Sequence, residues 1–136
     1  MHDDDLDFFG QSHDVAAEIS AQLEDVRAEL AVWAAAALLN RRPQARVYRG
    51  SKGEALCRQD MDFHLRHLHS ALARGAEVLV DYQGWVTAMF AQRGVDPSEI
   101  SRGVAVLAEG LHRYLPEPAA RAAAQLLLAA FEQGPE

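Results

Sequence analysis

The sequence predicts a single domain made only of α-helices, on three observations. The chain has 136 residues, close to the commonest size of one domain, and 49% of them are apolar, enough for one core. Alanine and leucine are abundant while β-branched residues are sparse, a balance that favours helix over strand. Apolar residues also recur at steps of three and four, the repeat of one helix face. We therefore interpret residues 1–136 as one all-α domain, with residues 1–12 as a flexible start.

Five helices are expected, and the first three follow one another closely. The first pattern covers residues 15–39 and fits either one long helix or two shorter ones. A loop with proline, glycine and five basic residues follows over residues 40–53. A second helix is predicted over about 52–74 and a third over about 76–92, each followed by a glycine that can end it.

The fourth helix has the clearest start in the chain. Asp96 can act as the N-cap, Pro97 suits the first helical position, and Glu99 stands three residues after the cap, the spacing of a capping box. This helix is expected to end near Tyr114. A fifth helix follows over residues 116–131, where alanine is frequent.

Charge and composition exclude several classes of function. The formal net charge of −7 repels nucleic acids and anionic membrane surfaces, so neither is expected as a partner. No apolar run approaches the roughly 20 residues that span a bilayer. Cys57 is the only cysteine, and the acidic start of the chain is unlike a secretory signal peptide. We therefore expect a cytoplasmic protein.

The second helix carries the residues that suggest chemistry. At 100° per residue, Cys57 and His64 lie on the edge of its apolar face and Asp60 lies just beyond. A thiol, an imidazole and a carboxylate would then line the margin between core and solvent, where a cofactor cleft can form. The ordinary interpretation is that Cys57 fills core space, His64 is a half-buried, hydrogen-bonded residue and Asp60 is a surface carboxylate.

The same helix contains the string Cys57-Arg58-Gln59-Asp60-Met61-Asp62-Phe63-His64-Leu65-Arg66. A cysteine, an aspartate three residues later, an aromatic residue and then Leu-Arg form a pattern that resembles the chromophore helix of phycobiliproteins. Similar segments follow in that family's order over about residues 20–133, among them Leu39-Asn40-Arg41-Arg42-Pro43 and Ala73-Arg74-Gly75. The resemblance implies an all-α, globin-like domain of the phycobiliprotein type, with a shortened N-terminal region.

The resemblance also implies a ligand, a bilin such as phycocyanobilin or biliverdin. Cys57 matches the cysteine that forms a thioether with the bilin, and Asp60 matches the aspartate that accepts hydrogen bonds from the pyrrole nitrogens. A thiolate is a good nucleophile, and a carboxylate makes charge-assisted bonds with pyrrole N–H groups, so both roles are chemically sound.

Further residues are expected to complete such a pocket. His64 lies one turn further along the same strip as Asp60. Tyr82, Trp85 and Phe90 on the facing helix offer flat surfaces for stacking. Basic residues just upstream of the string could reach the ring carboxylates: Arg46, Arg49 and Lys52.

Two departures from the family pattern argue against an antenna subunit. The family has arginine immediately before the aspartate, whereas this chain has Gln59 there. Arg58 cannot replace that arginine, because one residue rotates a side chain by 100° around the helix. The N-terminal region is also shorter than the paired helices through which antenna subunits associate. A stand-alone relative, with or without a chromophore, fits better.

Other kinds of site are less well supported by the sequence. A globin-type haem needs an axial histidine on the facing helix, and residues 76–92 contain none. His64, His67 and His69 do not complete a set of metal ligands, so no metal site is expected. No nucleophile is paired by spacing with a base, so we do not expect an enzyme.

Two functions therefore remain open. The first is a bilin-binding sensor or pigment carrier with the chromophore attached at Cys57. The alternative is a chromophore-free, globin-like signalling domain that acts through dimerisation and contact with a signalling protein. A homodimer is expected, because Trp33 and the N-terminal Leu6, Phe8 and Phe9 exceed the apolar surface that so small a core hides.

Overall fold

The computed structural model describes residues 13–42, 48 and 50–132, and within them it contains five α-helices and no strand. The helices are α1 (His13–Arg41), α2 (Gly53–Arg74), α3 (Glu77–Gln92), α4 (Pro97–Tyr114) and α5 (Glu117–Glu132). The prediction of an all-helical chain is confirmed. Each helix begins and ends within two residues of its expected bounds, and the first pattern forms one continuous helix.

Local sequence signals account for several of the helix ends. The backbone N–H of Ser98 donates to the Asp96 carboxylate at 2.9 Å, so Asp96 caps α4 as expected. Gly75 and Gly94, after α2 and α3, have φ angles of +113° and +77°, which glycine adopts more readily than any other residue. These glycines therefore let the chain turn sharply between neighbouring helices.

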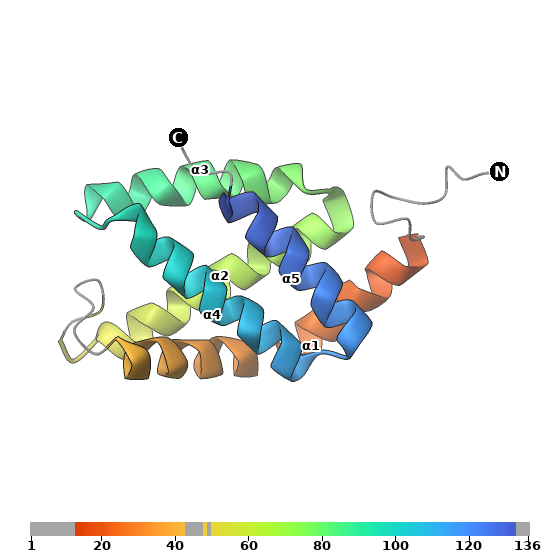
Figure 1. The fold of residues 1–136 in the computed structure, drawn as a ribbon, viewed down its shortest axis with the longest axis horizontal. Coiled ribbons are helices and arrows are strands. Elements are labelled where there is room, and N and C mark those ends of the chain that lie inside the picture. The colour runs from red at the N-terminus through yellow and green to blue at the C-terminus, as the bar shows by residue number, and fades with distance from the viewer. Residues whose placement is uncertain (1–12, 43–47, 49, 133–136) are drawn as a thin grey trace.

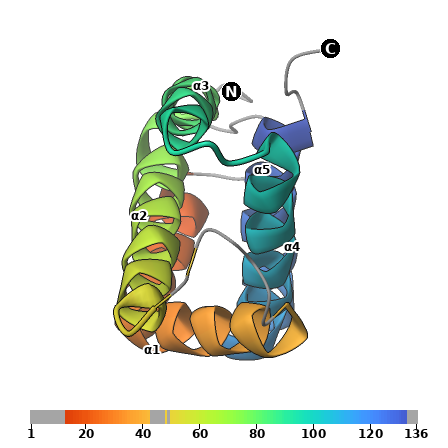
Figure 2. The same ribbon diagram turned by 90° about the vertical axis from the view of Figure 1, so that its left-hand side faces the viewer.

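The helices are arranged in two layers (Figure 1 and Figure 2). α2 makes one layer and α4 with α5 makes the other, while α1 closes one edge between them. α3 lies across the opposite edge, where it packs mainly against α2 and also touches α5 and α4. α3 is therefore an edge helix, with one face turned away from the other four helices.

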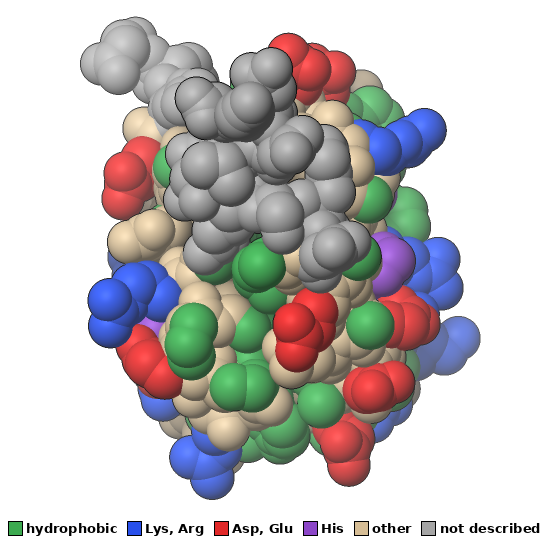
Figure 3. All heavy atoms as spheres, turned by 90° about the vertical axis from the view of Figure 1, so that its right-hand side faces the viewer, with side chains coloured by type: hydrophobic (Ala, Val, Ile, Leu, Met, Phe, Trp, Pro, Cys, Tyr) green, Lys and Arg blue, Asp and Glu red, His purple; other side chains and the backbone are tan. Residues whose placement is uncertain are grey.

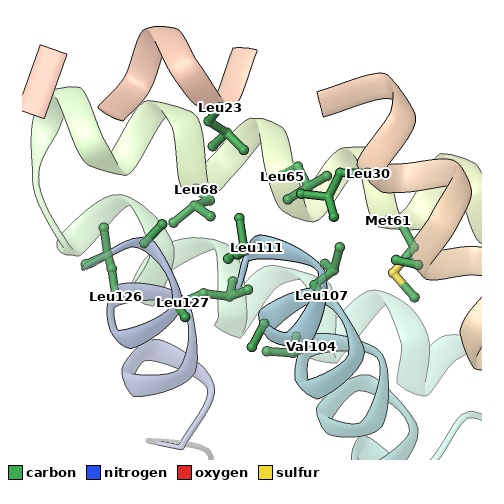
Figure 4. Close-up of a cluster of buried hydrophobic side chains, with 14 of the residues drawn as sticks. Leu23, Leu30, Met61, Leu65, Leu68, Val104, Leu107, Leu111, Leu126 and Leu127 are labelled. Atoms are coloured by element: carbon green, nitrogen blue, oxygen red, sulfur yellow. The ribbon is translucent and has the colours of Figure 1, made fainter. Parts of the chain in front are cut away.

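The core lies between the layers, and its largest fully buried side chains are mostly leucine, as Figure 4 shows for part of it. Every helix contributes side chains that are almost fully buried, among them Leu23, Leu30, Met61, Leu65, Leu68, Leu79, Val86, Val104, Leu107, Leu111 and Leu127. Burying one such side chain stabilises a fold by roughly 1.5–3 kcal/mol, so this cluster is the main source of stability.

α1 and α4 approach each other closely at Gly110. A Cβ atom on Gly110 would overlap Leu30 Cδ1 and would lie 3.2 Å from the Trp33 ring. Trp33 itself is half-buried and lies edge-on to Tyr114, with ring centroids 6.5 Å apart. Trp33, from which self-association is expected, is thus partly covered by its own chain.

Several residues named above lie outside the described part of the chain: Leu6, Phe8, Phe9, Arg46 and Arg49. Lys52 is described, and it lies exposed at the N-cap position of α2. Within the described ranges, no helix is both long enough and apolar enough to cross a membrane.

Candidate functional site

Cys57 lies completely inside the core, with no exposed surface. The helical period predicts a place at the margin between core and solvent, and this prediction is wrong because Tyr48 of the preceding loop packs against the core beside it. Burial, together with the nearby Asp60, raises the pKa of Cys57 to about 12. The thiol is therefore protonated at neutral pH and is a poor nucleophile.

Asp60 is also buried rather than on the surface, and it is held from two sides. Tyr48 Oη donates to Asp60 Oδ2 at 2.8 Å, and Nη1 of Arg93 lies 3.5 Å from the same oxygen. Burial raises the pKa of Asp60, while the Tyr48 hydrogen bond and the Arg93 charge oppose that rise. Arg93 follows α3 directly, and its guanidinium lies over the Phe90 ring, 4.6 Å from the centroid. Asp60 thus connects α2 to the loop before it and to the end of α3.

His64 is buried one turn further along α2 and is hydrogen-bonded, as its ordinary interpretation requires. Its Nδ1 lies 2.6 Å from the hydroxyl oxygen of Tyr82 on α3. Burial, with a smaller effect from His67, lowers the pKa of His64 to about 4. Burial and the charge of Asp60 raise the pKa of Tyr82 above its ordinary value. Both groups are therefore uncharged at neutral pH and share a neutral hydrogen bond.

Phe63, His67, Tyr82 and Trp85 form an aromatic cluster on α2 and α3. The rings of His67 and Tyr82 are stacked, with centroids 3.8 Å apart and planes 13° apart. The Trp85 ring centroid lies 6.0 Å from that of Phe63 and 6.1 Å from that of Tyr82. Tyr82 is buried, whereas 52% of Trp85 is exposed. The structure thus brings Tyr82 and Trp85 together, one inside the fold and one at its surface.

The loop that carries Tyr48 is held tightly against the start of α2. The N–H of Gly53 donates to the Gly50 carbonyl at 3.1 Å, and a Cβ atom on Gly53 would lie 2.5 Å from the carbonyl oxygen of Tyr48. Real Cβ atoms do not approach an oxygen that closely, so only glycine fits at the first position of α2. The place of Tyr48, and with it the hydrogen bond to Asp60, depends on this glycine.

Tyr48 and Arg93 are the partners of Asp60 that the sequence analysis does not identify. Both lie outside the helix that carries the string, so the helical period gives no information about them. A signal for each is nonetheless present in the sequence. Tyr48 is the only aromatic residue between 40 and 53, and Arg93 is the first basic residue after Arg74.

Three surface hollows are lined by other residues. One lies at the start of α2 beside Lys52 and Gln59. The other two follow the N-terminal half of α1, one against the start of α5 at Ile19 and the other against α2 at His69. Figure 3 shows hydrophobic side chains between acidic and basic ones on the face that holds this half of α1. None of these three hollows is lined by Cys57, Asp60 or His64.

Among the residues that the structure describes, no group of three or more His, Cys, Asp or Glu side chains could hold a metal ion. No protein-family model, curated protein or solved structure matches the chain.

Proposed function

We propose that this chain is a chromophore-free, globin-like domain of the phycobiliprotein type that works by dimerisation and contact with a protein partner, not by catalysis. The observation that carries the proposal is that the chain's own side chains already engage Cys57 and Asp60. Cys57 is enclosed in the core, and Asp60 holds both Tyr48 and Arg93. These are the two groups through which a bilin would be attached and oriented.

Attachment of a bilin would require a change at both the Cys57 thiol and the Asp60 carboxylate. A thioether forms from a thiolate at an accessible sulfur, whereas a pKa of about 12 leaves Cys57 protonated inside the core. Pyrrole N–H groups would also have to displace the Tyr48 hydroxyl from Asp60, and Arg93 would lose part of its interaction. A chromophore-free domain needs neither change.

A tetrapyrrole-binding sensor or pigment carrier is the second candidate, and one observation favours it. The aromatic cluster of Phe63, His67, Tyr82 and Trp85 begins within one turn of Asp60 and reaches the surface at Trp85. Flat aromatic side chains of this kind suit stacking on a conjugated ligand. In this candidate the Tyr48 loop moves aside, and the sulfur and carboxylate that it covers become the attachment and orientation groups.

Pigment binding distinguishes the two candidates. The chain is produced together with a haem oxygenase and a bilin reductase, which supply biliverdin and phycocyanobilin, and the visible absorbance of the purified protein is measured. We expect a colourless protein whose denatured band shows no zinc-enhanced fluorescence. A coloured wild-type protein that keeps its pigment through denaturation, while the Cys57→Ala variant does not, would contradict the proposal and establish the second candidate.

A further inference from the structure

Large hydrophobic side chains are exposed on α3, the edge helix. Among the described residues, three such side chains are exposed: Trp85 at 52%, Val32 at 50% and Val80 at 40%. Trp85 and Val80 both belong to α3, whereas Val32 stands alone on α1. An exposed tryptophan near an exposed valine on one helix is typical of a protein–protein contact surface.

α3 also carries very little charge. Of its 16 residues, the charged ones are Glu77 and Asp81, both in its first half. Residues 82–92 contain no charged side chain, although this helix lies at the edge of the fold (Figure 2), where a helix normally turns charged residues to water. The exposed residues of this uncharged stretch are Gly84, Trp85, Ala88, Ala91 and Gln92.

Gly84 is not explained by packing against the other residues that the structure describes. It lies in the middle of α3, where glycine lowers helix stability relative to alanine. A Cβ atom on Gly84 would meet nothing within 4 Å, whereas one on Gly110 would overlap a core side chain. A second backbone that approaches α3 closely from outside would account for Gly84, because glycine leaves room for such an approach.

We propose that Val80, Gly84, Trp85, Ala88 and Ala91, here called the α3 face, form a dimer interface with a second copy of this chain. In this dimer α3 packs antiparallel against the same helix of the partner, about a two-fold axis near Gly84. The axis places each Trp85 beside Gly84 of the partner subunit, so the two apolar faces cover each other. The inference rests on the proposed function, because it names the surface through which the domain dimerises.

Charge favours a second copy of this chain as the partner that covers the α3 face, and it favours an antiparallel arrangement of the two α3 helices. Each chain has a formal net charge of −7, so two copies repel each other least where they meet through a surface with few charges, which on α3 are Glu77 and Asp81. About an axis near Gly84, antiparallel helices bring Glu77 close to Arg93 of the partner subunit, twice in the dimer. Parallel helices would instead set Glu77 and Asp81 against identical acidic residues.

Cross-linking tests the direction of packing. Asp81 and Ala88 lie on either side of Gly84, so antiparallel helices bring position 81 of one copy near position 88 of the other. Under mild oxidation we expect a mixture of Asp81→Cys and Ala88→Cys chains to form several-fold more disulfide-linked dimer than either variant alone. The wild-type chain is the control, because its only cysteine, Cys57, is buried. Equal cross-linking of the single variants, or none in the mixture, would overturn the inference.

Light scattering tests the surface itself. We expect the wild-type chain to be a dimer and Ala88→Glu to raise the dissociation constant about tenfold or more, because it buries an unpaired charge. Val32→Glu is the matched control, since Val32 is as exposed as Trp85 but lies on α1, and this variant should stay dimeric. Circular dichroism confirms that both variants keep their helices. A wild-type monomer at the highest concentration reached, or a dimer that survives Ala88→Glu, overturns the α3 interface.

A wild-type monomer would contradict both the α3 interface and the dimerisation in the proposed function, whereas the other outcomes separate the two. A dimer that survives Ala88→Glu uses another surface, which rejects the α3 interface and leaves the partner-binding domain in place. Pigment attached at Cys57 rejects the chromophore-free domain whatever the oligomeric state.

Discussion

The two buried polar side chains of α2, Asp60 and His64, each have a partner from another element. Asp60 binds Tyr48 and Arg93, and His64 binds Tyr82. A buried polar group that loses its partner costs about 1–3 kcal/mol. These pairings therefore fix α2 in one rotation about its axis, in addition to the packing of its leucines.

We predict that His64 makes the fold sensitive to mild acid. Its pKa is 6.5 in the unfolded chain and about 4 when folded, so between these values the unfolded chain binds more protons. The contribution of His64 to the free energy of unfolding is therefore fully present above pH 6.5. It is lost as the pH falls towards 4, by a total on the order of 3 kcal/mol. Urea unfolding at a series of pH values measures this change.

The variant His64→Gln tests the assignment of this pH dependence. Glutamine does not titrate and can still accept a hydrogen bond from Tyr82, so the fall in stability below pH 6.5 should largely disappear. The same substitution at the exposed His112 is the matched control and should leave the pH profile as it is in the wild type. A wild-type profile in His64→Gln would show that another group causes the acid sensitivity.

We also predict that the native Cys57 thiol reacts very slowly with a thiol reagent such as a disulfide dye. A pKa of about 12 in place of 9.0 lowers the thiolate fraction at neutral pH about a thousandfold, and burial blocks access as well. Rapid reaction should appear only in denaturant. A cysteine placed at the exposed Ser101 on α4, outside the α3 face, is the control and should react at once in the native chain. Fast native labelling of Cys57 would favour the bilin candidate.

At the residue scale, the helical period alone identifies which side chains of one helix are neighbours. It predicts correctly that Cys57, Asp60 and His64 follow one strip of α2. It does not predict their depth, because the burial of Cys57 and Asp60 depends on Tyr48 and Arg93, which come from other elements. Contacts between separate elements depend on how the chain folds back, which periodicity does not contain.

At the scale of single helices, the sequence predicts ends well because their causes are local. Asp96 caps α4, and Gly75 follows α2, within a few residues of the signal in each case. The pattern over residues 15–39 fits one helix or two equally well, because this segment contains no glycine or proline that would mark a break. Packing decides that question in favour of one helix, α1.

Two helix glycines should respond to alanine in opposite directions. Gly110→Ala gains helix propensity but forces a Cβ atom onto Leu30 and Trp33, and overpacking of this kind costs about 1–3 kcal/mol. Gly84→Ala meets nothing within 4 Å and should stabilise the monomer by up to about 1 kcal/mol. Urea unfolding of both variants at low concentration measures the difference. Equal effects at the two positions would mean that α1 and α4 do not approach as described.

At the scale of the whole molecule, the all-helical class follows from composition, whereas the arrangement of the helices does not. The close approach of α1 and α4 and the place of α3 at one edge both depend on contacts between distant segments. The edge position matters most for function, because it turns the apolar α3 face to the outside. The sequence predicts self-association through Trp33 and the N-terminal residues, and it contains no signal that α3 is uncovered.

If the chain dimerises, its thermal stability should depend on concentration. Binding between folded chains stabilises the dimer by about 1.4 kcal/mol for each tenfold rise in concentration. The melting temperature of the wild type should then rise with concentration by a few degrees per tenfold step. Ala88→Glu should show a smaller rise over the same series, because less of it is dimeric at each concentration. Identical concentration dependence in the two chains would place the dimer contact elsewhere.

The contact between Gly53 and the Tyr48 carbonyl also limits how this sequence can diverge. Glycine is needed at position 53 only while Tyr48 lies where a side chain would otherwise be, and tyrosine is needed at 48 only while a carboxylate is buried at 60. Positions 48, 53 and 60 therefore constrain one another, although no bond joins the last two. Among descendants of this chain, glycine at 53 should be inherited together with aspartate at 60, and lineages that lose the aspartate should be free to replace the glycine.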